Sequence, residues 1–277
     1  MSKSPIKLLN PTQFEAALDP ELPNGYLSPS QVNKYLNCPK NYFFTYVLGN
    51  RFRANERMVL GTCTHKLVEN AINLKINNNN KTPKIEEVLD SSRSEVENIY
   101  FDEDGEPPSL DGDEPLLGLE SILDSAQKSF MCWYKDKMPR ISPVQSEKLA
   151  LFSVHGIPIK GYIDYIDLTP EGLRVVDLKV GKKKRDPLDS VQLALYALAE
   201  STPLVGYDTI LQPTKRLPHR LFESEACLSE AFLNHVSSMV VNVHRGITSG
   251  YFPECLPDNW LCKPTWCSNY NDCRGKD

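Results

Sequence analysis

The chain has 277 residues, of which 40% are apolar and 24% charged, proportions that suit one large soluble domain or a domain with an appendage. No apolar run is long enough to span a bilayer, and the N-terminus lacks the apolar core of a secretory signal. We therefore expect a cytoplasmic protein with no membrane partner. The net charge of −5, taken alone, argues against a nucleic-acid partner. However, residues 101–115 carry seven acids and no base, and the rest of the chain has local basic clusters that can face a phosphate backbone.

The N-terminal half has the periodicity of helices. Ser28 and Gln31 have the spacing of a capping box, and Pro29 suits the first helical position, so a helix begins there. Pro39 ends or kinks this helix, and an aromatic run continues in a second short helix. Further helices are predicted near residues 13–18 and over residues 58–76, 85–100 and 116–137.

From residue 144 onward the period becomes that of β-strands. Strands are predicted over residues 144–154, 159–168 and 173–180, with turn residues between them. A helix over 189–200, a strand over 205–212 and a helix over 228–245 follow, before a cysteine-rich tail. The order strand, strand, strand, helix, strand predicts a mixed α/β domain with a helical N-terminal part.

Two acidic residues occur in successive predicted strands. Asp164 and Asp177 each follow apolar residues, and Lys179 lies two positions after Asp177, on the same face of the strand. Carboxylates can hold Mg²⁺ or Mn²⁺ for phosphodiester hydrolysis, and the backbone carbonyl of Leu178 is a third candidate ligand. Lys179 is the candidate to orient or deprotonate the attacking water. An isolated Asp-x-Lys pattern is more often a solvated strand face, but the second acid favours a metal site.

Three side chains on predicted helices are further candidates. A lone histidine on an apolar helix, such as His65, is more often structural, yet a neutral imidazole also binds metals beside carboxylates. Glu69, four residues later, shares its helix face and can orient it. Gln192 and Tyr196 also share a helix face, which is typical of an ordinary amphipathic helix or of a contact with a phosphate or a base.

Four of the eight cysteines lie in the last 23 residues. In a cytoplasmic protein of this size, clustered cysteines bind metal more often than they form disulfides. Cys262, Cys267 and Cys273 have a spacing that fits neither zinc-ribbon nor ferredoxin patterns and that still needs a fourth ligand. Cys255 competes with Cys262 for a place. The cysteines in apolar contexts are expected to be core residues: Cys63, Cys132 and Cys227.

Together these motifs resemble the RecB-type branch of the PD-(D/E)XK nuclease superfamily. They occur in that family's order: Gly61-Thr62 with His65, Gly161-Tyr162-Ile163-Asp164, Asp177-Leu178-Lys179, and Gln192 with Tyr196. The resemblance implies an α/β, restriction-endonuclease-like core in which helices flank a central mixed sheet. It implies metal binding by His65, Asp164, Asp177 and the Leu178 carbonyl, a catalytic Lys179, and a DNA-binding side shaped by Gln192 and Tyr196. Val180 stands where many members have threonine, a mild departure.

The surroundings of Cys38, directly before Pro39, are similar to the N-terminal cysteine of the family's iron–sulfur subgroup. That subgroup includes CRISPR-associated spacer-acquisition nucleases, AddB-type nuclease domains and phage exonucleases. The resemblance implies a [4Fe–4S] cluster held by Cys38, Cys262, Cys267 and Cys273, with Zn²⁺ in the same four-cysteine site as the alternative. The corresponding parts are an N-terminal segment (1–57), a helical part with the acidic loop (58–143), a nuclease core (144–250), and a tail (251–277) that packs back on the N-terminal segment.

The resemblance predicts a metal-dependent deoxyribonuclease, foremost an exonuclease on single-stranded DNA or DNA ends, in recombination or repair, phage DNA processing or spacer acquisition. The alternatives are a structure-specific endonuclease and a DNA-binding assembly subunit of a larger nuclease complex. Phosphate contacts are expected from Lys182, Lys183, Arg51 and Arg53, although a solvated turn accounts for the lysines equally well. The sequence has no Gly-rich, Lys-containing nucleotide-binding motif, so unwinding requires a helicase partner. Recombination or spacer-acquisition proteins are the other expected partners.

Overall fold

The computed structural model describes residues 6–50, 52, 54–101, 108 and 118–275. Within these residues the centre is a six-stranded sheet in the order β1-β2-β3-β4-β5-β6. The strands are β1 (Ile6–Leu8), β2 (Pro143–Val154), β3 (Ile157–Thr169), β4 (Gly172–Gly181), β5 (Leu204–Leu211) and β6 (Arg220–Cys227). Neighbours are antiparallel except β4 and β5, which are parallel because helix α7 (Val191–Glu200) crosses over between them.

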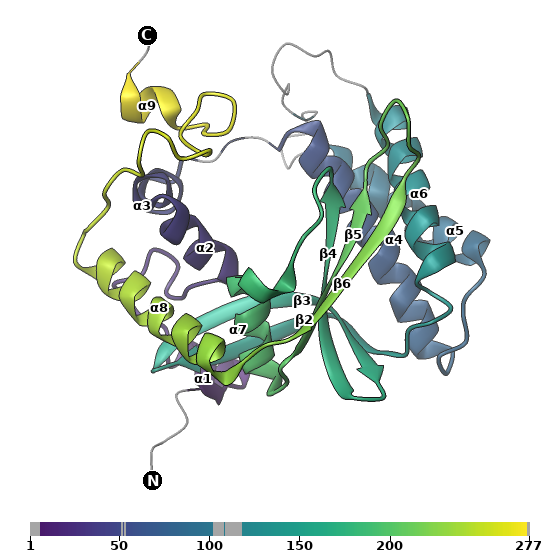
Figure 1. Ribbon diagram of the computed structural model, residues 1–277, viewed down its shortest axis with the longest axis horizontal. Helices are drawn as coiled ribbons and strands as arrows, with labels where there is room; N and C mark the ends of the chain where they lie inside the picture. Colours follow the sequence, from purple (N-terminus) through teal and green to yellow (C-terminus); the bar gives the residue numbers. More distant parts are fainter. Residues whose placement is uncertain (1–5, 51, 53, 102–107, 109–117, 276–277) are drawn as a thin grey trace.

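Helices cover both faces of the sheet (Figure 1). One face carries α2 (Pro29–Asn37), α7 and α8 (Glu230–Thr248); the other carries α4 (Glu56–Asn77) and α6 (Leu119–Asp136), with α5 (Ile85–Tyr100) packed on α4. Each face has its own buried core, built around Phe152, Ile159 and Leu193 on the first and around Leu67, Phe130 and Trp133 on the second. A mixed sheet between two helical layers confirms the predicted α/β fold.

The part of the N-terminal segment around residues 35–47 lies beside the C-terminal tail (Figure 1). After a short helix α1 (Pro11–Glu15), α2 begins with the predicted capping box and ends before Cys38, where α3 (Pro39–Tyr42) and a π-helical turn η1 (Phe43–Val47) follow. The N–H of Lys40 donates to the Pro253 carbonyl at 3.1 Å, and the hydroxyl of Tyr35 donates to the Tyr251 carbonyl at 2.5 Å. These bonds join α2 and α3 to the tail, which contains α9 (Tyr270–Arg274).

Strands β1 and β6 were not predicted from the sequence, and Cys227, an expected core residue, is exposed. β1 is only a short strand, and β6 lies at the sheet edge, where charged side chains replace the apolar alternation of a buried strand. Cys227 ends β6 and is exposed, so its prediction as a core residue was wrong, because it lies at a strand end and not within a helix. Cys63, by contrast, is buried in α4. None of the helices in the described part of the chain is long and apolar enough to cross a membrane.

Candidate active site

The two predicted carboxylates lie on neighbouring strands at the point where those strands separate. The β3–β4 ladder ends with Tyr165 opposite Val176, so Asp164 and Asp177 are the next pair in register. In place of a further backbone bond, the N–H of Leu178 donates to Oδ2 of Asp164 at 2.6 Å. The N–H and C=O of a strand residue point to the same side, so the Leu178 carbonyl also faces the side of Asp164. The predicted third oxygen ligand therefore lies on the same side as the first.

Lys179 and Asp177 project from the same face of β4, as their spacing predicts. Nζ of Lys179 lies 2.6 Å from Oδ2 of Asp177, whose side chain is only 3% exposed. Although this is a close ion pair, no donor in the described structure is aligned to form a hydrogen bond to that buried oxygen. A buried carboxylate oxygen without an aligned donor is chemically suited to an oxygen-seeking cation.

His65 approaches the carboxylates from the facing helix α4. Its Nδ1 lies 3.6 Å from Oδ1 of Asp164. Glu69, which shares its helix face, instead accepts a hydrogen bond from Lys66 at 3.1 Å. Asp164, and not Glu69, is thus the acidic neighbour that faces the imidazole.

Burial is the largest influence on the pKa values of the four ionisable groups in this site. It raises the pKa of Asp177 to about 6, against the opposing effect of Lys179. Burial also raises the pKa of Asp164, but His65 and Lys179 outweigh it, and the net pKa lies below the usual value. Burial lowers the pKa of both Lys179 and His65, yet the carboxylates raise both pKa values above their usual range. The carboxylates thus favour the protonated, positively charged forms of Lys179 and His65. A divalent ion that binds the carboxylates would compete with these two positive charges.

Gln192 and Tyr196 lie on α7, behind the strand that carries Asp164. The Tyr196 side chain is 4% exposed, and burial raises the pKa of its hydroxyl, an effect that the neighbouring Gln192 side chain and Tyr162 backbone oppose. Its ring occupies the space that a side chain at position 161 would need: a Cβ on Gly161 would lie 2.8 Å from Cε1 of Tyr196. The glycine of the motif is thus explained by the close approach of the tyrosine ring.

One carboxylate near the site was missed by sequence reasoning. Glu147 lies in β2 between Ser146 and Lys148, which pair with Tyr165 and Ile163, so its position is opposite Asp164. Its backbone has a positive φ of 44°, which is uncommon for a residue with a side chain. Burial, followed by Asp164 and Glu69, raises the pKa of Glu147 to about 7. The only signal in the sequence was an acid on the preceding strand, and its meaning depends on a strand register that the sequence does not specify.

The predicted phosphate contacts are partly placed. Lys182 and Lys183 are exposed in the segment that follows β4, five and six residues after Asp177 along the chain. Arg51 and Arg53 lie outside the described residues, as does most of the acidic loop over 101–115.

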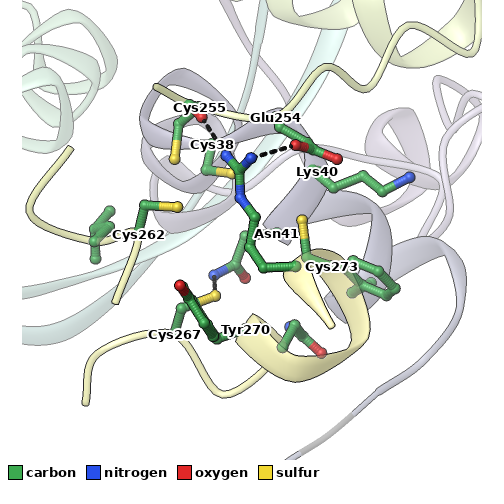
Figure 2. Close-up of a pocket in the computed structure, with 13 residues that line it drawn as sticks. Cys38, Lys40, Asn41, Glu254, Cys255, Cys262, Cys267, Tyr270 and Cys273 are labelled. Atoms are coloured by element: carbon green, nitrogen blue, oxygen red, sulfur yellow. Dashed lines mark hydrogen bonds and ion pairs between the residues drawn. The ribbon is translucent and has the colours of Figure 1, made fainter. Parts of the chain in front are cut away.

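Five cysteines from the two ends of the chain line one pocket (Figure 2). They are the four predicted ligands Cys38, Cys262, Cys267 and Cys273, together with Cys255. The cavity measures about 20 Å³, room for roughly one water-sized group. The four thiols implied by the resemblance are therefore gathered in one place, with one thiol in addition.

Candidate metal ligands lie near one another in both the acidic site and the cysteine pocket, but neither group has the geometry of a complete metal site. Among the residues that the structure describes, no three histidine, cysteine, aspartate or glutamate side chains stand together in metal-binding geometry. In the acidic site His65 and Lys179 face the carboxylates, so binding an ion requires these contacts to loosen. The chemistry of the donors still fits: oxygen donors for Mg²⁺ or Mn²⁺ in one place, and thiols for a softer metal in the other.

Comparison with known proteins gives one family. The sequence model of the PD-(D/E)XK nuclease superfamily matches residues 26–274, a range that contains both the acidic site and the cysteine pocket. Among solved structures, that of SSO0001 aligns with 14% sequence identity and a TM-score of 0.39, covering 91% of this chain and 87% of that chain. No protein of curated function matches the chain.

Proposed function

Because the chain belongs to the PD-(D/E)XK nuclease superfamily, we propose that it is an Mg²⁺- or Mn²⁺-dependent deoxyribonuclease, acting as an exonuclease on single-stranded DNA or DNA ends. The observation that carries this proposal is the meeting of Asp164, Asp177 and Lys179 where β3 and β4 separate. Phosphodiester hydrolysis needs charge neutralisation, an activated water and a stabilised leaving oxygen. Carboxylates can hold a divalent ion that meets these needs, and a lysine can orient the water or stabilise the developing charge.

Each residue has a distinct proposed role. Asp164, Asp177 and the Leu178 carbonyl would hold the divalent ion, with His65 as a further ligand beside Asp164. When bound, the ion polarises the phosphate and lowers the pKa of a water. Lys179 orients the attacking water or stabilises the developing negative charge, and its ion pair with Asp177 places its ammonium at that point. Gln192 and Tyr196 shape the DNA-facing side, and Lys182 and Lys183 contact phosphates as they approach.

The test uses 5′-labelled linear single-stranded DNA and a covalently closed circle of the same sequence. With Mn²⁺ or Mg²⁺, the purified protein should degrade the linear strand and leave the circle intact, and EDTA should stop degradation. Cleavage of the circle would identify an endonuclease. Absence of degradation of either substrate in both metals would contradict the nuclease proposal.

We also propose that the cysteine pocket is a metal centre. The resemblance favours a [4Fe–4S] cluster on Cys38, Cys262, Cys267 and Cys273, while the small cavity favours the alternative, a single Zn²⁺, because a cluster of eight atoms requires the lining to open further. Metal analysis and the visible absorption spectrum of anaerobically purified protein separate the two: iron, sulfide and a brown colour indicate the cluster, and a colourless protein with zinc indicates the ion.

The proposed setting rests on the resemblance alone. It is DNA recombination or repair, phage DNA processing or spacer acquisition, with a helicase, recombination or spacer-acquisition protein as partner. Co-purification with a DNA-unwinding partner, followed by faster digestion of duplex DNA, would support this setting.

A further inference from the structure

Two segments at one end of the sheet carry an excess of positive charge. Residues 182–185 follow β4, and residues 212–220 form the turn between β5 and β6 together with the first residue of β6. Neither segment contains an acid, although the whole chain has a net charge of −5. Their lysines and arginines are all exposed, and we call them the basic ridge: residues 182–185 with Lys215, Arg216 and Arg220.

The strand register places both segments directly beyond the candidate active site. β4 and β5 run parallel (Figure 1), with Lys179 opposite Thr209 and Gly181 opposite Leu211. The N–H of Gln212 donates to the Gly181 carbonyl at 2.8 Å, so the two segments leave the sheet side by side. Gly181 follows Lys179 by two residues, which is about 7 Å along a strand. The basic ridge therefore begins next to the proposed catalytic lysine.

Contacts with β6 hold the first segment over the face of the sheet that carries Lys179. Nζ of Lys184 lies 4.4 Å from the centroid of the Phe222 ring, and the hydroxyl of Ser224 donates to the Arg185 carbonyl at 2.8 Å. Through β5, Phe222 is in register with Lys179, and side chains in register project to the same face. Phe222 lies two strands from Lys179, roughly 10 Å across the sheet. The ridge thus continues over this face from the site toward the sheet edge.

The positive charge of the ridge is not neutralised within the described structure. Among the residues that the structure describes, no carboxylate forms an ion pair with a ridge side chain. The first acid after each segment is engaged elsewhere. Glu223 pairs with Lys137 at 2.6 Å and with Arg140, and Oδ1 of Asp186 accepts a hydrogen bond from the Leu188 N–H at 3.0 Å. The ridge therefore presents its charge to a polyanion in solution.

We propose that the basic ridge binds the phosphate backbone of a single DNA strand, and that the β5–β6 turn directs this strand toward Asp177 and Lys179. Lysine and arginine side chains neutralise phosphates and release their counterions, which gives affinity without reading the base sequence. The inference rests on the proposed function for the identity of the substrate. It adds Lys215, Arg216 and Arg220, which come from a separate turn, to the lysines that follow β4.

Binding measured without cleavage tests the ridge. Fluorescence anisotropy of a 5′-labelled single strand in EDTA gives the Kd at several salt concentrations. We expect Lys215→Ala/Arg216→Ala to raise the Kd at least about tenfold at low salt, and to reduce the slope of log Kd against log salt by about 1.4, because each phosphate contact on a single strand contributes about 0.7. The charge-conserving Lys215→Arg/Arg216→Lys should bind within about twofold of wild type.

The matched control is Lys81→Ala/Lys84→Ala, which removes two exposed lysines from the turn between α4 and α5. This turn follows the end of α4 at Asn77, which lies about 18 Å along the helix from His65. The Kd and the salt slope of the control should equal those of wild type, and circular dichroism checks that each variant is folded.

The binding data can overturn the proposal in several ways. A wild type that does not bind the strand, a Lys215→Ala/Arg216→Ala variant that binds like wild type, or an equal loss in the control would each contradict it. An acidic protein surface is the other polyanion that such a charge attracts. Competition by polyglutamate as strong as by unlabelled DNA would therefore also overturn the assignment to DNA.

Cleavage in Mn²⁺ is measured separately, so that the two proposals can fail independently. In an active nuclease, Lys215→Ala/Arg216→Ala should raise KM by a larger factor than it lowers kcat, and an unchanged KM would contradict a strand path over the ridge. If wild type binds the strand in EDTA but cleaves nothing in either metal, the nuclease proposal fails, and the binding data still decide the role of the ridge.

Discussion

Oδ2 of Asp164 accepts a hydrogen bond from the backbone N–H of Leu178 at 2.6 Å, across the point where β3 and β4 stop pairing. The bond replaces a missing rung of the ladder with a side chain. It thereby orients both the carboxylate and the peptide group between Asp177 and Lys179. Both groups are held by β-strands and not by a loop, and rigid elements are expected to hold a site that positions a reacting group.

The glycine beside Tyr196 gives a prediction about packing. Gly161→Ala places a Cβ 2.8 Å from the Tyr196 ring and 3.2 Å from Cδ of Pro29, so the ring must move. We expect a loss of about 1–3 kcal/mol in the free energy of unfolding. Urea denaturation measures it, with Gly181→Ala as the control, because a Cβ there meets nothing within 4 Å. An equal loss of unfolding free energy in the two variants would show that moving the Tyr196 ring does not destabilise the fold.

The buried charge network behind the site predicts a larger effect. Asp208 is 1% exposed and accepts hydrogen bonds from Trp133 at 2.8 Å and Tyr165 at 2.6 Å, while Lys137 lies 3.1 Å away. Asp208→Ala leaves the buried Trp133 and Tyr165 donors without this acceptor and leaves Lys137 with Glu223 alone, so we expect a loss of about 3–5 kcal/mol in unfolding free energy.

The control for that measurement is Asp124→Ala. Its carboxylate pairs with Lys128 on the exposed surface of α6, and we expect a change below about 0.5 kcal/mol. Urea denaturation of both variants decides the matter, and a small loss in Asp208→Ala would contradict the proposed importance of the network.

Glu147 predicts a pH dependence of stability. Its pKa is raised from 4.5 to about 7 by burial, Asp164 and Glu69, with His65 and Lys66 opposing. Because its pKa is raised in the folded state, protonated Glu147 contributes to the free energy of unfolding. This contribution is fully present below pH 4.5 and is lost as the pH rises through about 7, because Glu147 ionises at lower pH in the unfolded chain. The neutral Glu147→Gln lacks this loss, so in EDTA it should exceed wild type in stability at pH 8 and match it at pH 4.5.

Because Glu147 is half-buried, solvent screening limits the expected difference at pH 8 to about 1 kcal/mol. Urea midpoints of the two proteins across this pH range measure the difference. Glu171→Gln, in the exposed turn between β3 and β4, provides the comparison. A difference that is constant with pH would show that Glu147 does not titrate as described.

Much of the fold could be predicted because periodicity and turn residues are local properties. The capping box at Ser28 and the Asp-x-Lys strand are examples, since each is written within a few consecutive residues. Edge strand β6 could not be predicted, because its partially exposed positions relax the alternation that identifies a strand. The same reason explains the incorrect placement of Cys227.

The residues of the candidate site likewise differ in whether the local sequence identifies them. The carboxylates, Lys179 and His65 carry their chemistry in residue type and order, whereas Glu147 joins them only through the register of β2 on β3. Cys255 likewise joins Cys38 in one pocket only through the path of the tail. Relations between distant segments are set by tertiary packing, which spacing in the sequence does not encode.

The central claim is that Asp177 and Lys179 carry out metal-dependent hydrolysis of DNA. The most direct measurement is the rate at which labelled linear single-stranded DNA is degraded in Mn²⁺ by wild type, Asp177→Asn, Lys179→Ala and the remote control Asp124→Asn, with folding checked by circular dichroism. We expect rates at least about a hundredfold below wild type for the first two variants and an unchanged rate for the control. Degradation at the wild-type rate by folded Asp177→Asn or Lys179→Ala would contradict the account.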